Sequence, residues 1–359
     1  MTMRRTLFLI LILAVVVSGS LACRSKYPRG LYAEVSTNKG LIVIRLEFEK
    51  TPMTVANFVG LAEGTVDNAA LLPGTFYFNG SKWHRVVPGH VIQCGVPKDG
   101  KAEGPGYQFP NEIDLSLNHD KAGMVGMANA GPHTNGSQWY ITLGDRSYLN
   151  GNYTVFGEVI QGMDVVKAIV QGDDVIAVKI VRIGRNAGQF RPTTASFKKM
   201  VGEAEARVAG EAAERKVREE ELVKSRWPNA VAGENGVRFV ILKEGREKPA
   251  APGAIVRASY SGQALLSGLT FVGTADAGKP YRGEKPEPFD FEIGKTKINP
   301  GLDAALAQMK KGEKRTLIIP AEQAYGRNGF YAKQRPNEKR FVIPPFALLV
   351  IEVEILNIP

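Results

Sequence analysis

Residues 83–95 read Trp-His-Arg-Val-Val-Pro-Gly-His-Val-Ile-Gln-Cys-Gly, and this stretch decides the fold of the first half of the chain. Its apolar residues alternate with polar ones, and a Pro-Gly pair interrupts the alternation. This pattern predicts two short strands joined by a tight turn. Arg85 and Gln93 are then expected to face the same surface of the hairpin.

Two further stretches follow in the chain. Residues 127–141 read Met-Ala-Asn-Ala-Gly-Pro-His-Thr-Asn-Gly-Ser-Gln-Trp-Tyr-Ile and are rich in turn-forming residues. Residues 148–157 read Tyr-Leu-Asn-Gly-Asn-Tyr-Thr-Val-Phe-Gly and contain an Asn-Gly pair, a favourable hairpin turn. In this order the three stretches resemble the cyclophilin family, over residues 30–185. The resemblance implies a mainly-β closed barrel.

The same resemblance implies peptidyl-prolyl cis-trans isomerase activity and assigns site residues. Arg85 matches the family's catalytic arginine, whose guanidinium bonds the prolyl nitrogen as that nitrogen becomes pyramidal, and Gln93 is expected to steady it. Outside such a motif, a lone arginine is more typically a solvated surface charge. The positions that match peptide-binding residues are His90, Val91, Ala128, Asn129, Ala130, Gln138, Tyr140, Tyr148, Leu149 and Tyr153.

Four of these positions depart from the family's pattern. His90 and Tyr140 each replace a phenylalanine of the proline slot. Tyr148 stands where many members have tryptophan, and Tyr153 where many have histidine. The changes predict a more polar slot, with a reduced rate or an altered sequence preference.

The reaction that the resemblance implies breaks no bond. Rotation about a peptide bond meets a barrier of ~18 to 20 kcal/mol, and the Xaa-Pro bond isomerises slowly enough to limit folding. A site that lowers this barrier needs a donor aimed at the prolyl nitrogen and an apolar slot for the ring. The sequence shows no phosphate-binding glycine loop, and its four histidines lack metal-ligand spacing. We therefore expect neither a cofactor nor a metal.

The start of the chain predicts export. Residues 1–5 are short and basic, and residues 7–17 form an apolar run, which is typical of a signal peptide over residues 1–22. Eleven residues at ~1.5 Å each span only about half of a ~30 Å hydrocarbon core. Cleavage is expected just before Cys23. Leu21-Ala22-Cys23 resembles a bacterial lipobox in which the leucine is shifted by one place, so we expect a lipid anchor at Cys23 in a bacterial periplasm or cell envelope. Alternatively, Cys23 is simply the first mature residue.

Residues 192–228 are rich in Ala, Glu, Lys and Arg and predict a helical linker, capped by Thr193 or Thr194. An apolar stripe begins at Phe197 and fails at Arg215, so a long coiled coil is not supported. Packing of the helix onto one of the domains is the alternative. Four pairs spaced i,i+4 favour an exposed helix, namely Glu203/Arg207, Glu211/Arg215, Glu214/Arg218 and Glu220/Lys224.

Residues 236–359 form a second domain. Short strand patterns precede a helix expected over residues 301–312, which ends at a glycine, and the alternating run 346–358 predicts a strand that covers it. The segment resembles an FKBP-type prolyl isomerase domain, which implies an α+β fold with an antiparallel sheet wrapped on a helix. The motifs that carry the resemblance are Tyr260-Ser-Gly262, Pro288-Phe-Asp-Phe291, Gly301 with its helix, Ala324-Tyr-Gly326 and Val342-Ile-Pro-Pro345.

The resemblance also implies a second substrate pocket, although an aromatic and aliphatic cluster is more often ordinary core. Val272 stands in place of the family's pocket aspartate, Leu302 in place of the tryptophan floor, and Asn299 in place of an aliphatic residue. We therefore expect this domain to hold clients more than to turn them over. The implied pocket residues are Tyr260, Phe271, Phe289, Ile298, Leu302, Tyr325, Ile343 and Ile351.

The sequence thus predicts a peptidyl-prolyl cis-trans isomerase that acts on proline-containing unfolded or nascent exported proteins. A holdase chaperone that binds proline segments without turnover is the alternative. The net charge is +10, of which +6 lies in residues 236–359. In an exported protein this charge favours acidic clients or anionic lipid over nucleic acid. The single remaining cysteine, Cys94, excludes a disulfide framework, and the sequence indicates no particular oligomeric state.

Overall fold

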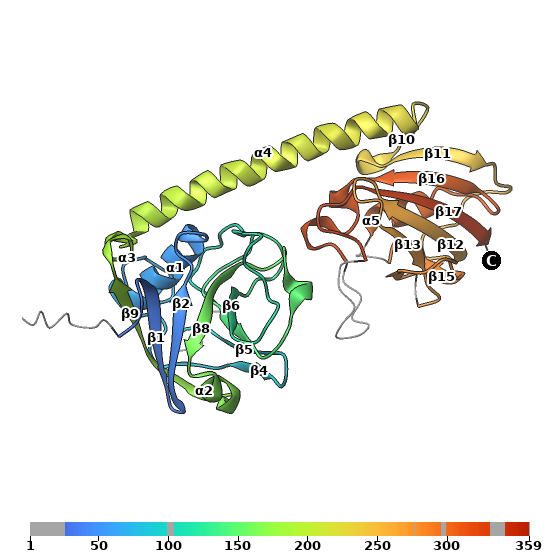
Figure 1. Ribbon diagram of the computed structural model, residues 1–359. Helices are drawn as coiled ribbons and strands as arrows, with labels where there is room; N and C mark the ends of the chain where they lie inside the picture. The colour runs from blue at the N-terminus through green and yellow to red at the C-terminus, as the bar shows by residue number, and fades with distance from the viewer. Residues whose placement is uncertain (1–25, 99–103, 277, 296–298, 331–341, 359) are drawn as a thin grey trace, which may run out of the picture.

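The computed structural model describes residues 26–98, 104–276, 278–295, 299–330 and 342–358. Three parts follow one another: a β-rich N-terminal domain, the long helix α4 and a second β-rich domain (Figure 1). The predicted signal peptide, Cys23 and Ile298 lie outside the described residues. No helix among the described residues is long and apolar enough to cross a membrane.

The N-terminal domain is built on a nine-stranded antiparallel sheet, and its strand order is β3-β9-β1-β2-β8-β6-β7-β5-β4. The strands are β1 (Gly30–Thr37), β2 (Gly40–Leu46), β3 (Ser81–Lys82), β4 (Arg85–Val87), β5 (Val91–Cys94), β6 (Met124–Met127), β7 (Trp139–Thr142), β8 (Val155–Gln161) and β9 (Asp174–Ile183).

The sheet is open, so the predicted closed barrel is wrong. Its two end strands, β3 and β4, are consecutive in the chain and do not pair with each other. Only Trp83 and His84 separate them, and Trp83 exchanges backbone hydrogen bonds with Asp173 and Gly172. The chain therefore turns from one edge of a curled half-barrel to the other without a ladder that closes it.

The concave side of this sheet is filled by aromatic side chains and by helix α1 (Pro52–Glu63). Phe58 of α1 packs at 5.5 Å from Trp139 and at 5.4 Å from Phe156, ring centre to ring centre. The Glu112 carboxylate accepts from the backbone N–H groups of Met53 and Thr54, which caps the first turn of α1. Two shorter helices, α2 (Met163–Ala168) and α3 (Arg185–Gln189), and the 3₁₀ turn η1 (Ser147–Leu149) complete the domain.

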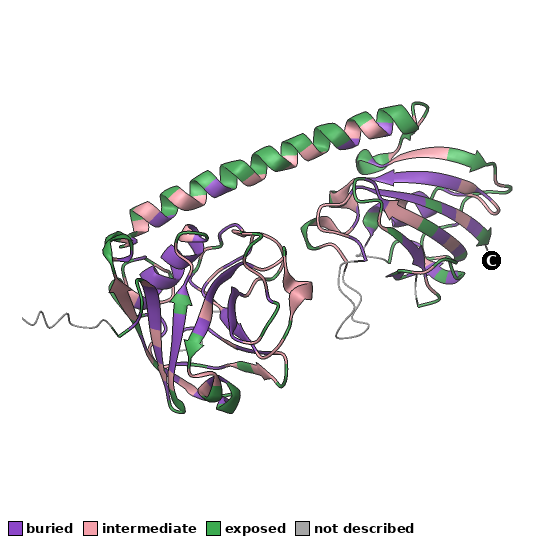
Figure 2. Cartoon of the chain, viewed as in Figure 1, coloured by how far each residue is buried: buried purple, intermediate pink, exposed green. Residues whose placement is uncertain are grey.

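Helix α4 (Thr194–Arg226) has 33 residues and is about 50 Å long. Thr193 and Ser196 form a reciprocal capping box at its start. Phe197 packs into the N-terminal core against Tyr107 and Phe109, while Val223 near the other end joins a cluster on the second domain. Most of the residues between are exposed (Figure 2). The helix therefore packs on both domains with its ends.

The C-terminal domain has an eight-stranded antiparallel sheet, and helix α5 (Pro300–Leu306) packs on one face. The helix predicted over 301–312 is shorter in the structure. After Leu306 the α-helical pattern gives way to i→i+3 hydrogen bonds, from Gln308 to Ala305 and from Met309 to Leu306. The strands are β10 (Val231–Ala232), β11 (Arg238–Lys243), β12 (Ile255–Ala264), β13 (Thr270–Gly273), β14 (Pro280–Tyr281), β15 (Phe289–Glu292), β16 (Lys314–Ile319) and β17 (Leu349–Asn357). The 3₁₀ turns are η2 (Glu234–Gly236), η3 (Ala321–Gln323) and η4 (Gly326–Asn328).

Candidate active site

The β4–β5 hairpin places the predicted catalytic pair side by side. Arg85 pairs with Gln93 across the hairpin, and Gly89 in the turn has a φ of 68°, which favours glycine. The Arg85 Nη1 donates to Gln93 Oε1 at 3.2 Å, and Gln93 Nε2 donates to Gln138 Oε1 at 2.8 Å. Arg85 itself is exposed. The side-chain amides of Gln93 and Gln138 therefore orient the guanidinium of Arg85, whose remaining N–H groups face solvent.

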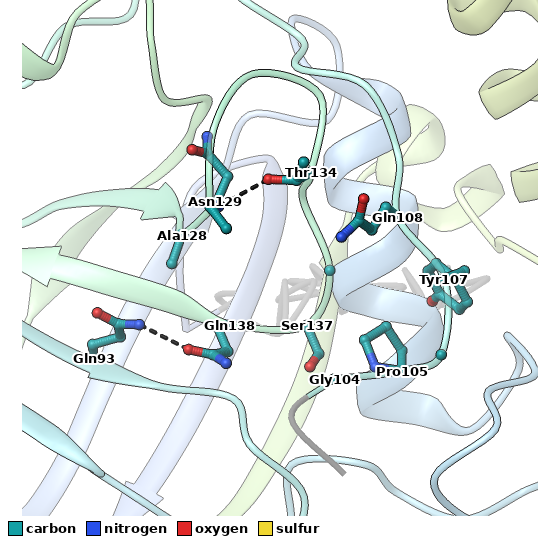
Figure 3. A pocket seen from close by; sticks show the side chains of 13 residues that line it. Gln93, Gly104, Pro105, Tyr107, Gln108, Ala128, Asn129, Thr134, Ser137 and Gln138 are labelled. Atoms are coloured by element: carbon teal, nitrogen blue, oxygen red, sulfur yellow. Dashed lines mark hydrogen bonds between the residues drawn. The ribbon is translucent and has the colours of Figure 1, made fainter. Parts of the chain in front are cut away.

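A cavity of about 660 Å³ opens beside this chain (Figure 3). Gln93 and Gln138 lie at one side of it, and the backbone of Ala128, Asn129 and Ala130 forms another wall. The mixture of small, amide and glycine residues suits an extended peptide better than a rigid aromatic ligand. The lining is completed by Gly104, Pro105, Gly106, Tyr107, Gln108, Thr134, Gly136 and Ser137.

Residues 128–136, which form one wall of the cavity, are held in place by hydrogen bonds within the domain. The Ala128 N–H donates to the Gln138 carbonyl at 2.9 Å, and Asn129 Nδ2 donates to the Asn152 carbonyl at 3.1 Å. The Thr134 hydroxyl accepts from the Ala130 N–H at 2.8 Å. The Asn129 side chain, which lies beside the cavity, is therefore held by hydrogen bonds within the domain.

Tyr140, which was expected to add polarity to the proline slot, has its hydroxyl satisfied inside the domain. The hydroxyl lies 2.9 Å from His119 Nε2, and His119 Nδ1 lies 2.9 Å from Asn150 Oδ1. Because Asn150 Oδ1 can only accept, Nδ1 carries the proton and Nε2 accepts from Tyr140. Burial lowers the pKa of His119 and raises that of Tyr140, so both groups are neutral.

Space for that hydroxyl comes from Gly126, which pairs with Tyr140 across β6 and β7. A Cβ at Gly126 would overlap the Tyr140 hydroxyl. Our sequence analysis missed Gly126, His119 and Asn150. The one signal available was that a buried tyrosine in place of phenylalanine needs a partner and room.

His90 and Tyr148 meet at the other side of the hairpin. The Tyr148 hydroxyl lies 3.3 Å from His90 Nδ1 and 3.2 Å from Nε2, and the ring centres are 6.0 Å apart. Burial lowers the pKa of His90, and the charges of Arg146 and Arg85 lower it further. Val91 is buried in β5, Leu149 is half-buried in η1, and Tyr153 packs edge-on to Tyr140 at 6.1 Å. His90 thus contacts Tyr148 and Tyr140 contacts Tyr153, while the grouping of all these residues into one proline slot stays a prediction.

The residues predicted to form the second pocket converge too, but inside the core. The Tyr260 hydroxyl donates to the Gly278 carbonyl, and Tyr325 hydrogen-bonds to Tyr260 and Asn299. Burial raises the pKa of both tyrosines. Six of these side chains are exposed by 5% or less, namely Tyr260, Phe271, Phe289, Leu302, Ile343 and Ile351.

Two departures from the expected pocket have structural explanations. Asn299 caps α5, since its Oδ1 accepts from the Leu302 N–H at 3.1 Å. Val272 pairs with Ser261 and lines a separate cavity of about 580 Å³ together with Trp227 at the end of α4. Val272 therefore brings no hydrogen-bonding group to this cluster, whereas Asn299 hydrogen-bonds to Tyr325, the partner of Tyr260.

Comparison with known proteins assigns the class that this fold and site define, the peptidyl-prolyl cis-trans isomerases. Residues 32–185 match the family model of the cyclophilin type peptidyl-prolyl cis-trans isomerases, and residues 246–356 match that of the FKBP-type peptidyl-prolyl cis-trans isomerases.

Individual relatives agree with the first match. The chain is 47% identical over 143 residues to peptidyl-prolyl cis-trans isomerase A of Mycobacterium tuberculosis, covering 38% of this chain and 79% of that protein. It is 41% identical over 145 residues to peptidyl-prolyl cis-trans isomerase B of Streptomyces anulatus, covering 39% and 83%. The chain belongs to the cyclophilin-type family, and an FKBP-type domain follows its cyclophilin-type domain. It is a peptidyl-prolyl cis-trans isomerase.

Proposed function

We propose that Arg85 is the catalytic residue of the N-terminal site and that this site performs most of the turnover. As the Xaa-Pro bond rotates, amide resonance is lost and the lone pair localises on the prolyl nitrogen. A guanidinium is always charged and donates through several N–H groups. Arg85, exposed and held by Gln93, can donate to that nitrogen more strongly in the twisted state than in the planar one.

The surrounding groups bind the client. Ala128, Asn129 and Ala130 line the cavity and align an extended segment there. The prolyl ring is received outside that cavity, by His90, Val91, Tyr140 and Leu149. The hydrogen bond from Tyr140 to His119 supports this role, because it leaves the face of the Tyr140 ring as an apolar surface. The observation that carries the proposal is the chain from Arg85 through Gln93 to Gln138 at the cavity's edge.

The test is Arg85→Ala in the full chain, measured as turnover of a short proline peptide. Loss of one transition-state donor costs about 10² to 10³ in rate, and we expect a loss of that order with unchanged melting. Arg45→Ala is the matched control, because Arg45 on β2 is also exposed in this domain and pairs with Glu47 at 2.9 Å. Near-normal turnover of Arg85→Ala at an unchanged melting temperature contradicts the assignment.

We propose further that the C-terminal domain mainly holds clients. The burial of its candidate pocket residues and the internal bonding of Tyr260 support this. Positive charge allows this domain to attract acidic clients, since +6 of the net charge lies in residues 236–359. The test is suppression of aggregation of an unfolded acidic protein by the full chain carrying Arg85→Ala. Loss of that suppression together with turnover would place both activities in the N-terminal site.

The leader supports a third proposal: the protein is exported, is lipid-anchored at Cys23, and assists the folding of proline-containing exported proteins. A basic segment, an apolar run and a cysteine follow one another within residues 1–23. Mass spectrometry of the mature N-terminus tests this directly. Diacylated Cys23 is expected, and Cys23→Ser should release the protein from membranes. A mature chain that retains residues 1–22 contradicts the proposal.

A further inference from the structure

The loop of residues 130–134 has two sides with different neighbours. Its inner side supplies Ala130 and Thr134 to the wall of the 660 Å³ cavity. Its outer side touches the C-terminal domain, where the Asn328 side chain of η4 lies against Gly131. A Cβ at Gly131 would collide with Asn328 Oδ1. The substrate wall of one domain is therefore packed against the other domain.

A stack of three side chains marks the same contact. His133 of the loop lies 6.5 Å from Phe346, ring centre to ring centre, at an interplanar angle of 35°. The guanidinium of Arg215 on α4 lies 5.0 Å from the centre of the Phe346 ring. Phe346 is thus placed between a residue of the N-terminal domain and a residue of the linker helix, where a cation and an aromatic ring attract each other.

Backbone strain is concentrated at this stack. His133 has a φ of 62° and Phe346 a φ of 57°, both in the left-handed region that residues with a Cβ avoid. Among the described residues, only Asn235 and Glu247 of the other non-glycine residues share a positive φ. Such conformations are unfavourable and persist where the surroundings enforce them. Two of the four face each other across the interdomain contact.

His133 is tied rigidly to the substrate wall. Its N–H donates to Asn111 Oδ1 at 3.2 Å, and its Nδ1 accepts from the Asn111 N–H at 3.3 Å. The next residue, Thr134, accepts from the Ala130 N–H and donates to the Gly131 carbonyl at 2.7 Å. His133 is thus bonded to Asn111 and is followed directly by Thr134, whose hydroxyl fixes the turn that lines the cavity.

We infer that Phe346 of the C-terminal domain is a positioning residue for the reaction at the N-terminal site. By packing on His133 it holds residues 130–134 in the shape that binds the client segment. The C-terminal domain and α4 thereby contribute to the substrate site, although Phe346 and Arg215 are not among the residues that line the cavity. The inference rests on the proposed assignment of turnover to Arg85.

The test measures KM and kcat of the full chain for a proline tetrapeptide whose residues before proline can enter the cavity. For Phe346→Ala we expect KM to rise about three- to tenfold, the value of one good aromatic contact, with kcat changed by less than about twofold. Phe346→Tyr should restore KM, because it keeps the ring. Arg215→Ala should raise KM in the same direction by a smaller factor, since it leaves His133 and Phe346 in contact.

Tyr281→Ala is the matched control, because Tyr281 is an exposed aromatic residue on strand β14 of the same domain. Its KM should stay at the value of the unmodified chain. An unchanged KM in Phe346→Ala, while Arg85→Ala abolishes turnover, overturns the inference and leaves the proposed function intact. Turnover that survives Arg85→Ala overturns the proposed function instead. If Phe346→Ala lowers the melting temperature, the test rests on Arg215→Ala instead. An unchanged KM in Arg215→Ala then overturns the inference.

Discussion

The two isomerase-type domains differ in how far their candidate site residues are exposed. In the N-terminal domain, Arg85 is exposed beside an open cavity and is oriented by Gln93. In the C-terminal domain, the Tyr260 hydroxyl is bonded to the backbone of Gly278 and six candidate side chains lie in the core. The difference teaches that motif order identifies a fold in both halves, while a site also requires a donor that the fold leaves unsatisfied.

The largest effect that we predict concerns the C-terminal domain, whose candidate site residues are buried. Leu302→Ala should lower the stability of the C-terminal domain by about 2 to 5 kcal/mol, because Leu302 lies in the core. Turnover of a short proline peptide should not change at temperatures where the domain remains folded. Calorimetry and the peptide assay check both statements. Leu266→Ala, at a 42% exposed position of the same domain, is the control. A large loss of turnover in Leu302→Ala would give the second domain a catalytic share.

The second prediction concerns Tyr140, on the N-terminal side. Tyr140→Phe leaves His119 Nε2 buried without a partner, which should destabilise that domain by about 1 to 3 kcal/mol. The slot keeps its apolar ring face, so kcat/KM should change little. Chemical unfolding and peptide turnover measure the two effects, with Tyr281→Phe on the C-terminal domain as control. Unchanged stability would show that the hydrogen bond from Tyr140 to His119 contributes nothing net.

The third prediction separates the domains by pH. All four histidines lie in the N-terminal domain, and burial lowers the pKa of each. The unfolded chain therefore binds more protons near the ordinary histidine pKa of about 6.5, and stability falls as pH drops below that value.

Each histidine adds a slope of at most about 1.4 kcal/mol per pH unit. Calorimetry between pH 7 and pH 5 should show the N-terminal transition moving to lower temperature while the C-terminal transition moves less. An equal shift of both transitions would contradict the assignment to histidines.

The smallest predicted effect is on client attraction by the C-terminal domain. Its +6 charge should draw acidic unfolded chains at ~0.1 M salt, where the Debye length is ~10 Å, and much less at ~1 M, where it is ~3 Å. Suppression of aggregation by the full chain should therefore weaken with salt, while turnover of a neutral proline peptide at Arg85 should not. A basic client, tested beside the acidic one, serves as control. Salt-independent suppression of aggregation of both clients contradicts the electrostatic account.

The residue pattern was enough to identify the two domain types and to pair Arg85 with Gln93 across a hairpin. Hairpin chemistry is local: a Pro-Gly turn between two short strands places Arg85 opposite Gln93 whatever the rest of the chain does. Helix α4 could also be predicted from the sequence, because threonine capping and i,i+4 spacing of opposite charges act within a few residues. These features depend on neighbours in sequence, so residues close together carry the information.

Only the tertiary structure decided whether the sheet closes, which polar groups are satisfied, and how the domains touch. Trp83 directs the chain from one edge of the sheet to the other through bonds to residues about 90 positions away. Folding brings the buried His119 within 2.9 Å of the Tyr140 hydroxyl, and Phe346 packs against His133 although more than 200 residues separate them in the chain. Contacts of this kind depend on packing of distant surfaces, and no local pattern of residues encodes them.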